Sequence, residues 1–534
     1  MTVFALHQLL ANAAETRPDH TAVSYAGEAL SYQELYRRSR SVAAALIDAG
    51  VSRGDRVALY LPKGLDAVTA IYATMSAGAA YVPIDPASPA LRAATIVRDC
   101  RAAALVTTPG RARALLDAME DRPFRLVILS GDEGDPAPGL ASARLAEILR
   151  DTVDPKPVPV VDTDLAYLLY TSGTTGVPKG VMLTHRHALT FIGWCADTIG
   201  TSSEDRFSNH APFHFDLSVF DLYLAAYGSA TVCMVPEEWA YFGRDLARFI
   251  QRERISVWYS VPSALMLLTR AAREEDLFPS LRSVVFAGEV YPTKHLRALR
   301  SLVPNADLWN LYGPTETNVC TYHLVGDLPD DDETIPIGCA CENTDVFAIT
   351  DVGNLATVGE PGELYVRGSS VMNGYWGDPQ RSAQVLVEDP RGNGMSGLVY
   401  RTGDLVRPRP DGGFDFLGRR DHQIKSRGYR VELGEVEAAM NADDRLEAAI
   451  AVAVPHEDWG SAILAVVIPR KGHETLAEID VKRSVALRLP RHMVPARVDI
   501  RRSLPRTSTG KIDRRSVTDE VLARAWSWEG ESTR

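Results

Sequence analysis

Residues 170–180, YTSGTTGVPKG, combine four serine or threonine hydroxyls, three glycines and one lysine. They follow LAYLLY, a short apolar run that predicts a buried strand. Glycines let a backbone approach an anion closely, hydroxyls and amides donate to phosphate oxygens, and a lysine adds positive charge. A Walker loop is excluded, because Lys179 stands three residues after Gly176 and Gly180 follows it. The stretch therefore predicts a phosphate-binding loop of another kind, with a plain surface turn as the alternative.

A second group of polar residues lies in NLYGPTETNVC, residues 310–320. Thr315 and Glu316 place a hydroxyl and a carboxylate side by side after Gly-Pro. Hard oxygen ligands of this kind suit Mg²⁺, which keeps several waters and bridges the phosphates of a substrate. The same two residues could instead begin a helix, with Thr315 as its N-cap and Glu316 in its first turn. The residues alone leave both interpretations open.

Two further charged residues stand in turn-like segments. Asp404 follows Gly403 in YRTGDLVR, residues 400–407, where a carboxylate could accept hydrogen bonds from a ribose diol. Aspartate is also common in turns that bind nothing. Lys511 follows Ser-Thr-Gly in LPRTSTGKIDRR, residues 504–515, and taken alone it is a solvated charge on a polar loop.

The elements that must position these residues alternate between helix and strand. The capping box of Ser31 and Glu34 begins a helix that Gly50 ends, and residues 55–61 predict a strand. Residues 64–77 then predict a helix and residues 80–84 the next strand. This order predicts an α/β layer with mostly parallel strands, and the same texture continues to about residue 320.

The texture changes in the last two hundred residues. From about 335 to 418, short runs such as GELYVRG are separated by Gly, Asp, Asn and Pro, which predicts hairpins in a small β-rich subdomain. A charged segment after Gly418 becomes a helix at about Glu432, and the last hundred residues predict a compact α+β unit.

Composition limits the class of protein. With 534 residues, the chain is too long for one compact core, so at least two domains are expected. The net charge of -12 disfavours binding to nucleic acid or to an anionic membrane. We find neither a signal peptide nor an apolar run long enough to span a bilayer. The six cysteines contain no CxxC pair, which predicts reduced thiols in a cytoplasmic protein.

Taken together, these segments resemble the acyl-adenylate-forming enzymes, and more narrowly the adenylation domains of nonribosomal peptide synthesis. The resemblance covers nearly the whole chain and follows the family's order: LSYQEL, GAAYVPIDP, YTSGTTGVPKGV, HFDLSVFDLY, NLYGPTET, GELYVRG, YRTGDLVR, GRRDHQIKSRGYRVELGEVE and LPRTSTGKIDRR. It implies a large α/β amino-terminal core over residues 1–417, with the β-rich subdomain at about 335–417. A hinge at 418–421, with Asp421 as its pivot, would join this core to a mobile α+β domain over 422–534.

In such enzymes a carboxylate attacks the α-phosphate of ATP, pyrophosphate leaves, and a thiol then takes the acyl group from the adenylate. The resemblance implies one set of residues for the β- and γ-phosphates, another for the α-phosphate and Mg²⁺, and others for adenine and ribose. In that order they are Thr171, Ser172, Gly173, Thr174, Thr175 and Lys179; Thr315 and Glu316; Asn310 and Tyr312; Asp404 and Arg419.

Lys511 is the residue that the resemblance implies for catalysis of adenylation. Negative charge spreads over the α-phosphate and the bridging oxygen in the transition state, and a positioned ammonium stabilises that charge. No general base is needed, because a carboxylate is already ionised at neutral pH. Rotation at Asp421 would then withdraw Lys511 and bring the segment from Lys425 onward to the active site for thiol transfer.

Asp216 in HFDLSVFDLY matches the aspartate that amino-acid-activating members keep for the substrate's α-ammonium, although a helix cap is an alternative role for it. The resemblance implies that the other pocket residues are apolar or uncharged: Leu217, Phe220, Tyr259, Val285, Ala287, Leu311, Val319 and Cys320. With Lys511 meeting the substrate carboxylate, the pocket suits a small apolar amino acid. The set resembles that of free-standing activators of L-proline, which load a carrier protein for pyrrole formation.

No condensation-like or carrier-like segment flanks the motifs, so we expect the acceptor to be the phosphopantetheine arm of a separate carrier protein. Three alternatives remain. The protein could activate another small amino acid, it could be a CoA ligase for a small carboxylic acid, or it could be a silent nucleotide-binding scaffold. Asp216 speaks against the CoA ligase, and the presence of Lys179, Glu316 and Lys511 speaks against the scaffold.

Overall fold

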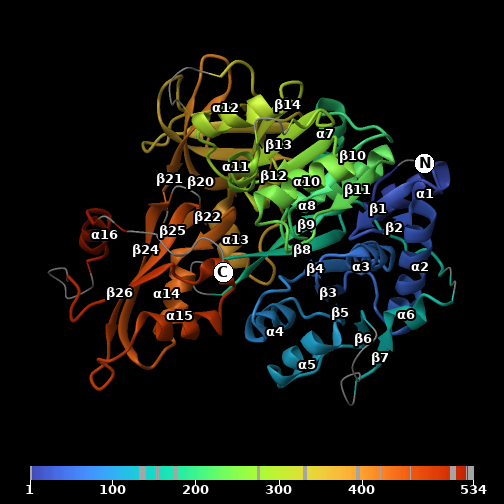
Figure 1. The fold of residues 1–534 in the computed structure, drawn as a ribbon, viewed down its shortest axis with the longest axis horizontal. Helices are drawn as coiled ribbons and strands as arrows, with labels where there is room; N and C mark the ends of the chain where they lie inside the picture. Colours follow the sequence, from blue (N-terminus) through green and yellow to red (C-terminus); the bar gives the residue numbers. More distant parts are fainter. Residues whose placement is uncertain are drawn as a thin grey trace. The chain divides into compact units, whose positions relative to one another are not determined.

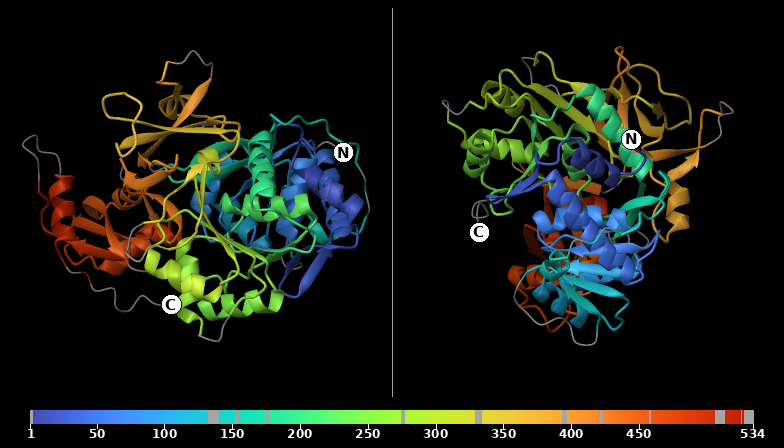
Figure 2. Two further views of the ribbon diagram at one scale, coloured as in Figure 1. Left: turned by 90° about the horizontal axis from the view of Figure 1, so that it is seen from above. Right: turned by 90° about the vertical axis from the view of Figure 1, so that its right-hand side faces the viewer.

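Figures 1 and 2 show a computed structural model of the chain, which forms two compact units. The first comprises Met1–Thr171 and Lys179–Asp421, and the second comprises Ser172–Pro178 and His422–Arg534. Each unit has hydrophobic clusters of its own. The structure describes residues 3–131, 140–151, 153, 155–173, 177–273, 277–328, 334–392, 397–420, 423–456, 459–505, 513–524 and 526.

Within the described residues, the first unit contains a seven-stranded sheet in the order β7-β6-β5-β3-β4-β8-β9. Neighbouring strands are parallel except β8 and β9. The strands are β3 (Arg56–Tyr60), β4 (Ala80–Pro83), β5 (Ala104–Thr107), β6 (Leu126–Leu129), β7 (Ser142–Arg144), β8 (Leu165–Thr171) and β9 (Lys179–Thr184). The helices between and after them are α3 (Leu65–Ser76), α4 (Ala90–Asp99), α5 (Pro109–Asp117) and α6 (Leu145–Ile148).

A second sheet of this unit has nine strands over the described ranges, in the order β16-β15-β14-β13-β12-β10-β11-β1-β2. Its middle strands, from β1 to β14 in this order, pair in parallel, and β2, β15 and β16 add antiparallel edges. The strands are β1 (Thr21–Tyr25), β2 (Glu28–Ser31), β10 (Arg206–Asn209), β11 (Thr231–Met234), β12 (Val257–Ser260), β13 (Ser283–Ala287), β14 (Asp307–Tyr312), β15 (Thr321–Leu324) and β16 (Cys339–Ala340).

Helices accompany this second sheet along the chain. They are α1 (His7–Thr16), α2 (Tyr32–Asp48), α7 (His185–Thr198), α8 (Leu217–Val219), the π-helix η1 (Phe220–Leu224), α9 (Ala225–Gly228), α10 (Gly243–Glu253), α11 (Pro262–Ala271) and α12 (Thr293–Leu302). A π-helix is rare and often marks a functional site. Here η1 follows directly on α8, which contains the predicted substrate residue Leu217, and η1 itself begins with another, Phe220.

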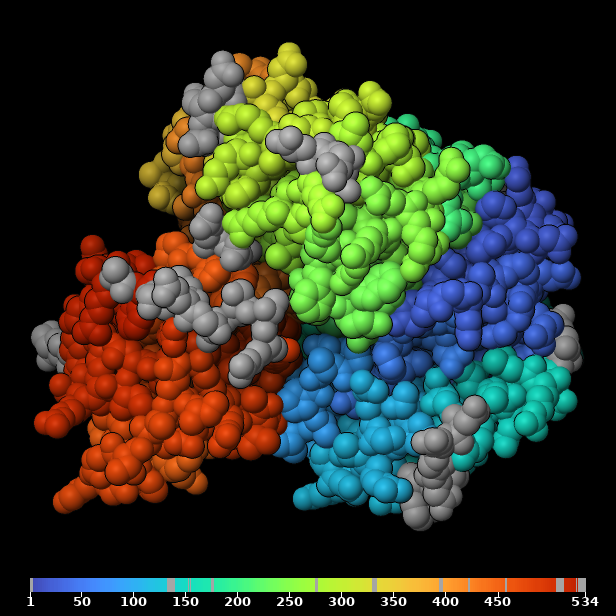
Figure 3. Space-filling model, in the orientation of Figure 1, coloured from blue at the N-terminus to red at the C-terminus, as the bar shows by residue number. Residues whose placement is uncertain are grey.

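The two large sheets are packed in layers. Alternate residues of a strand face opposite sides of its sheet, so each strand contributes to two clusters. In β3, Val57 and Leu59 join a cluster shared with the nine-stranded sheet, whereas Ala58 and Tyr60 pack with α4 and α5. Every residue of α3 except Asp66 is buried, as expected for a helix within the shared cluster. Helices α10, α11 and α12 cover the other face of the nine-stranded sheet. Figure 3 shows the surface of the chain in the orientation of Figure 1, coloured by residue number.

The third sheet of the first unit is antiparallel and has five strands in the part of the chain that the structure describes. Leu364 and Val406 form its fully buried centre. The strands are β17 (Thr344–Ile349), β18 (Gly362–Gly368), β19 (Leu386–Glu388), β20 (Leu398–Pro408) and β21 (Phe414–Arg419), with α13 (Pro379–Val385) between β18 and β19.

The second unit is an α+β structure. Alternate residues of β24 pack on opposite sides, with Ala449 and Ala451 in the cluster of α14 and α15, and Ile450 and Val452 in the cluster of α16. The strands are β22 (Gln423–Ser426), β23 (Tyr429–Glu432), β24 (Leu446–His456), β25 (Gly460–Pro469) and β26 (Arg497–Ile500). The helices are α14 (Leu433–Asn441), α15 (Glu478–Ala486), the 3₁₀ helix η3 (Arg491–Met493) and α16 (Arg514–Leu522).

The predicted fold class, α/β with a β-rich subdomain and a small α+β carboxyl-terminal part, is confirmed. Local signals also hold: the Ser31 hydroxyl accepts from the backbone N–H of Glu34 at 3.2 Å and caps α2. The predicted helix over 64–77 corresponds to α3, and the predicted strands over 55–61 and 80–84 correspond to β3 and β4. Among the described residues, none of the helices is both long and apolar enough to cross a bilayer.

Candidate active site

The hairpin between β14 and β15 carries the motif in which Thr315 and Glu316 stand, and it is tightly closed. A Cβ atom on Gly313 would lie 2.2 Å from the carbonyl oxygen of Asn318, so only glycine fits there. Thr315–Thr317 form the 3₁₀ helix η2, whose N-cap is Pro314. The interpretation of Thr315 as an α-helix N-cap is therefore wrong, because the loop turns back after a single short turn.

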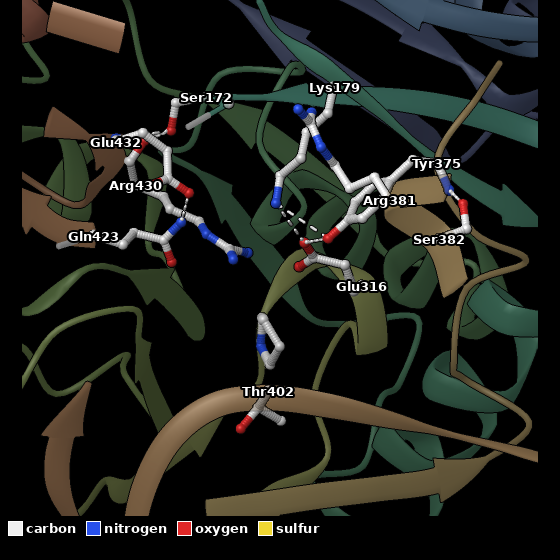
Figure 4. A network of polar contacts seen from close by, with 12 residues as sticks. Ser172, Lys179, Glu316, Tyr375, Arg381, Ser382, Thr402, Gln423, Arg430 and Glu432 are labelled. Atoms are coloured by element: carbon white, nitrogen blue, oxygen red, sulfur yellow. Dashed lines mark hydrogen bonds and ion pairs between the residues drawn. The ribbon is translucent and has the colours of Figure 1, made fainter. Parts of the chain in front are cut away.

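Glu316 and Lys179 form an ion pair inside the first unit (Figure 4). The Lys179 Nζ lies 3.3 Å from Glu316 Oε1, and the Tyr375 hydroxyl donates to the same oxygen at 2.7 Å. Lys179 also lies over the Tyr375 ring, 4.6 Å from its centroid. The Glu316 side chain is fully buried, so these two donors offset the free energy that removing a carboxylate from water requires.

The predicted ribose residues also lie together. Asp404 in β20 pairs with Arg419 in β21, and the Arg419 guanidinium donates to Asp404 Oδ1 at 2.6 Å. The Tyr312 hydroxyl donates to the other carboxylate oxygen, Oδ2. Burial raises the pKa of the Tyr312 phenol well above its ordinary value, and the Asp404 charge raises it further. The phenol thus remains a hydrogen-bond donor at neutral pH.

Strand β14 presents predicted site residues on both faces of the nine-stranded sheet. Asn310 and Tyr312 alternate with Leu311, so they face away from it. The Asn310 amide donates to the carbonyl of Pro336 at 2.8 Å and is thereby held in one orientation. The residues implied for adenine and the residue implied for the amino-acid pocket therefore come from opposite faces of one strand.

In the second unit, the first residues of the glycine-rich loop contact β23 and α14. The Ser172 hydroxyl donates to the carbonyl of Arg430 at 2.8 Å and accepts from the backbone N–H of Glu432 at 3.2 Å (Figure 4). The backbone N–H of Gly173 donates to a carboxylate oxygen of Glu435 at 3.2 Å. A carboxylate is an anion, so the buried Gly173 amide already donates to an anionic oxygen in this structure.

The predicted substrate residues on the sheet share one face. Tyr259 pairs with Val285 across β12 and β13, and Ala287 pairs with Leu311 across β13 and β14. Because paired residues point to the same side of a sheet, these side chains line one surface. All eight of the implied uncharged pocket residues are buried: Leu217, Phe220, Tyr259, Val285, Ala287, Leu311, Val319 and Cys320.

Aromatic rings form part of this surface. Phe220, the first residue of η1, makes an edge contact with Tyr259, with ring centroids 4.9 Å apart. Phe207 also packs against Phe220, with ring centroids 5.9 Å apart. Buried rings packed in this way are held in place and form a rigid apolar wall beside the predicted substrate residues.

Asp216 stands at the N-cap position of α8, but its side chain makes no capping hydrogen bond, so the helix-cap interpretation of this side chain is not supported. Its carboxylate lies close enough to two tyrosines to influence them. Burial raises the pKa of Tyr259 well above its ordinary value, and the charge on Asp216 is the next cause. Burial is also the main cause for Tyr167, where Asp216 adds to the effect. The negative charge is thus placed beside the apolar wall.

Several predicted residues cannot be placed. Lys511, Thr174, Thr175 and Asp421 lie outside the described residues. Conversely, the structure brings in Tyr375, which nothing in the sequence marked as part of the site.

Residues 10–376 match the AMP-binding enzyme family, and residues 435–511 match the AMP-binding enzyme C-terminal domain. The chain is 40% identical over 518 residues to an L-proline--[L-prolyl-carrier protein] ligase of Pseudomonas fluorescens, covering 97% of this chain and 99% of that one. It is 39% identical over 505 residues to a protein of the same name from Streptomyces coelicolor, with 91% of each chain covered. The amide bond synthetase McbA from Marinactinospora thermotolerans superposes with a TM-score of 0.83 at 25% identity, covering 97% of this chain and 100% of that one. This chain belongs to the AMP-binding enzyme family.

Proposed function

We propose that this protein activates L-proline with ATP, forming prolyl-AMP and pyrophosphate, and then transfers the prolyl group to the phosphopantetheine thiol of a separate carrier protein. The observation that carries the amino-acid part is the apolar surface of β12, β13, β14 and η1 with the Asp216 carboxylate beside it. A single negative charge next to apolar walls favours a ligand with one cationic group and an uncharged side chain.

The choice of proline among such ligands has two supports. The rings of Phe220 and Tyr259 are bulky and buried, so we expect the pocket beside them to suit a small side chain. Two relatives that match over nearly their whole lengths, at 40% and 39% identity, are named for L-proline and for an L-prolyl-carrier protein. The same names support a carrier protein as the acceptor.

In the first step, a carboxylate oxygen of proline attacks the α-phosphorus of ATP. The bond from that phosphorus to the oxygen bridging to the β-phosphate breaks, its electron pair leaves with pyrophosphate, and no proton moves. Lys179 and the amide of Gly173 would bind the departing phosphates, while Asp404 and Arg419 would hold the ribose. Lys511 would stabilise the charge that develops at the α-phosphate.

In the second step, the thiol sulfur attacks the acyl carbon, the acyl–phosphate C–O bond breaks, and AMP departs with that electron pair. The thiol proton passes to solvent. Prolyl-AMP is thereby converted to a prolyl thioester without any oxidation or reduction.

Mg²⁺ belongs to the same proposal, with Glu316 as the residue that would hold it. In the described part of the chain no three His, Cys, Asp or Glu side chains gather into a metal cage. One buried carboxylate is what Mg²⁺ uses when substrate phosphates and waters supply its remaining ligands, so the residues fit. A bound ion would neutralise charge on the phosphates.

The test is ATP–pyrophosphate exchange with each proteinogenic amino acid, followed by transfer to a pantetheinylated carrier protein or to free CoA. We expect L-proline to give the fastest exchange, charged amino acids to remain at background, and the carrier to accept the prolyl group. Faster exchange with another amino acid would refute proline as the substrate. Preferential acylation of free CoA would indicate a CoA ligase, and no exchange with any amino acid would contradict the activity.

A further inference from the structure

Asn318 adopts a backbone conformation that few residues other than glycine accept, with φ 55° and ψ -105°. Gly313 approaches this backbone closely: a Cβ atom on Gly313 would lie 2.2 Å from the carbonyl oxygen of Asn318 and 2.8 Å from the Cα of Val319. The hairpin therefore fixes the direction of the Asn318 side chain. Asn318 also stands directly before Val319 and Cys320, two of the residues implied for the amino-acid pocket.

The Asn318 amide is buried and has no hydrogen-bond partner among the described residues. Asn318 is 4% exposed, and neither Nδ2 nor Oδ1 of its side chain forms a hydrogen bond to any described residue. An amide in this position loses its water without replacement, which destabilises the protein until a ligand supplies the missing hydrogen bonds. Buried polar groups left unpaired are uncommon and often belong to binding sites.

The Tyr167 hydroxyl is a second buried group without a hydrogen-bond partner in the described structure. Burial raises the pKa of this phenol well above its ordinary value, the Asp216 charge raises it further, and the Asn318 amide opposes the shift. The phenol and the amide are therefore neighbours close to hydrogen-bond contact, although the pair does not reach the geometry of a well-formed hydrogen bond. A carboxylate, an amide and a phenol thus share one small region of the first unit.

We propose that Asn318 binds the substrate's α-ammonium together with Asp216, and that Tyr167 is a positioning residue for the Asn318 amide. Proline is a secondary amine, so its ammonium has two N–H groups. Asp216 would accept one and supply the counter-charge, while Asn318 Oδ1 would accept the other. The amide N–H of Asn318 would then donate to the Tyr167 oxygen, which satisfies both unpartnered groups. This inference rests on the proposed amino-acid activation.

The competing explanation is that Asn318 serves only the backbone, because asparagine tolerates positive φ better than most residues. Two substitutions separate the two roles. Asn318→Gly keeps the conformation and removes the amide, whereas Asn318→Ala removes the amide and also strains the backbone. Tyr167→Phe removes only the hydroxyl.

The experiment measures the KM for proline and for ATP in pyrophosphate exchange, together with the Ki of tetrahydrofuran-2-carboxylate, which has the ring and carboxylate but no N–H. For Asn318→Gly we expect the KM of proline to rise roughly 10- to 100-fold, as for a lost hydrogen bond to a charged group. The KM of ATP, the Ki of the analogue and the melting temperature should stay close to the wild-type values.

A wild-type KM for proline in Asn318→Gly, with a defect only in Asn318→Ala, would overturn the proposal in favour of a backbone role. An equal rise in the Ki of the analogue would also overturn it, because the amide would then shape the pocket rather than bind the amine. If Asn318→Gly is unstable, Tyr167→Phe decides: a several-fold higher KM for proline alone supports the proposal, and no change refutes it. Failure of the proposed function would show itself separately, as absent exchange in the wild type.

Discussion

Lys179 and Glu316 are 137 residues apart in the sequence, and their side chains meet at 3.3 Å. The carboxylate is fully buried and the lysine is only one-tenth exposed, so water screens the pair weakly. The family resemblance implies separate roles for these residues, with Lys179 at the departing phosphates and Glu316 at Mg²⁺. In this structure each is the counter-charge of the other, so a change in either should affect both the fold and the site.

Replacing Lys179 by methionine should destabilise the first unit, because the buried Glu316 carboxylate would lose the counter-charge of the Lys179 ammonium. Breaking a buried pair from one side typically costs about 3–5 kcal/mol. Adding Glu316→Gln to the same variant should restore much of that stability, since a neutral amide requires no counter-charge. Urea unfolding of the single and double variants measures both changes.

Arg186→Met is the matched control for this experiment. Arg186 pairs with Asp162 at 2.8 Å, but its side chain is half exposed. Exposed pairs contribute about 0–1 kcal/mol, so the control should unfold close to the wild type. Equal destabilisation by Lys179→Met and Arg186→Met would mean that burial does not increase the contribution of the Lys179–Glu316 pair to the free energy of unfolding.

Lys511→Ala should remove adenylate formation while leaving ATP binding and solubility intact. A single group that stabilises charge in the transition state typically contributes roughly 100- to 1000-fold in rate. Proline-dependent pyrophosphate exchange measures this loss, and Lys471→Ala, at an exposed lysine of the second unit, serves as the control. Near wild-type exchange in the Lys511 variant would show that catalysis lies elsewhere.

Much of the fold could be predicted because its signals are local. The cap at Ser31, the strand runs and the almost entirely buried helix α3 depend on residues a few positions apart. The site depends on distant residues instead. Tyr375 stands in GYWGD without any chemical signal, and it reaches Glu316 only because its segment bridges to Val181 in the folded unit.

The glycine-rich loop shows the same limit. Its hydroxyls and glycines predict an anion site, yet Ser172 and Gly173 bind groups of Arg430, Glu432 and Glu435 in the structure. The local composition indicates which groups a loop can bind. The groups that Ser172 and Gly173 bind in this structure belong to residues some 260 positions away, which the local sequence does not identify. The unusual backbone of Asn318 is likewise set by the approach of Gly313.

Acid should destabilise the first unit through its buried histidines. Burial is the main cause that lowers the pKa of His185 to about 3, with the neighbouring His7 next, while Asp164 and Asp162 oppose the shift. His185 Nδ1 accepts from the backbone N–H of Leu6 at 3.2 Å, which requires the unprotonated nitrogen. The unfolded chain binds this proton below about pH 6.5 and the folded chain does not, so stability falls as the pH falls.

The expected loss is about 2 kcal/mol from His185 at pH 5, one and a half units below the ordinary pKa. Urea unfolding between pH 7 and 4 should therefore show a shallower pH dependence for His185→Asn, whose amide oxygen can still accept from Leu6. His473→Gln, at an exposed position of the second unit, should leave the slope of the first unit unchanged. A His185 variant with the full wild-type slope would remove this residue from the explanation.

Asp216→Ala should remove most proline activation, because the substrate ammonium would lose its counter-charge beside the apolar wall. Losing one partner of a buried charge pair costs about 3–5 kcal/mol, or roughly two to four orders of magnitude in rate. Tetrahydrofuran-2-carboxylate has the same ring without the ammonium, so it should be a poor substrate for the wild type. The variant should discriminate far less between the two, since neither ligand then meets a charge.

Leu217→Ala, which removes pocket surface without removing charge, should lower both activities while keeping the wild-type preference for proline. If the wild type activates both ligands equally well, Asp216 does not recognise the amine.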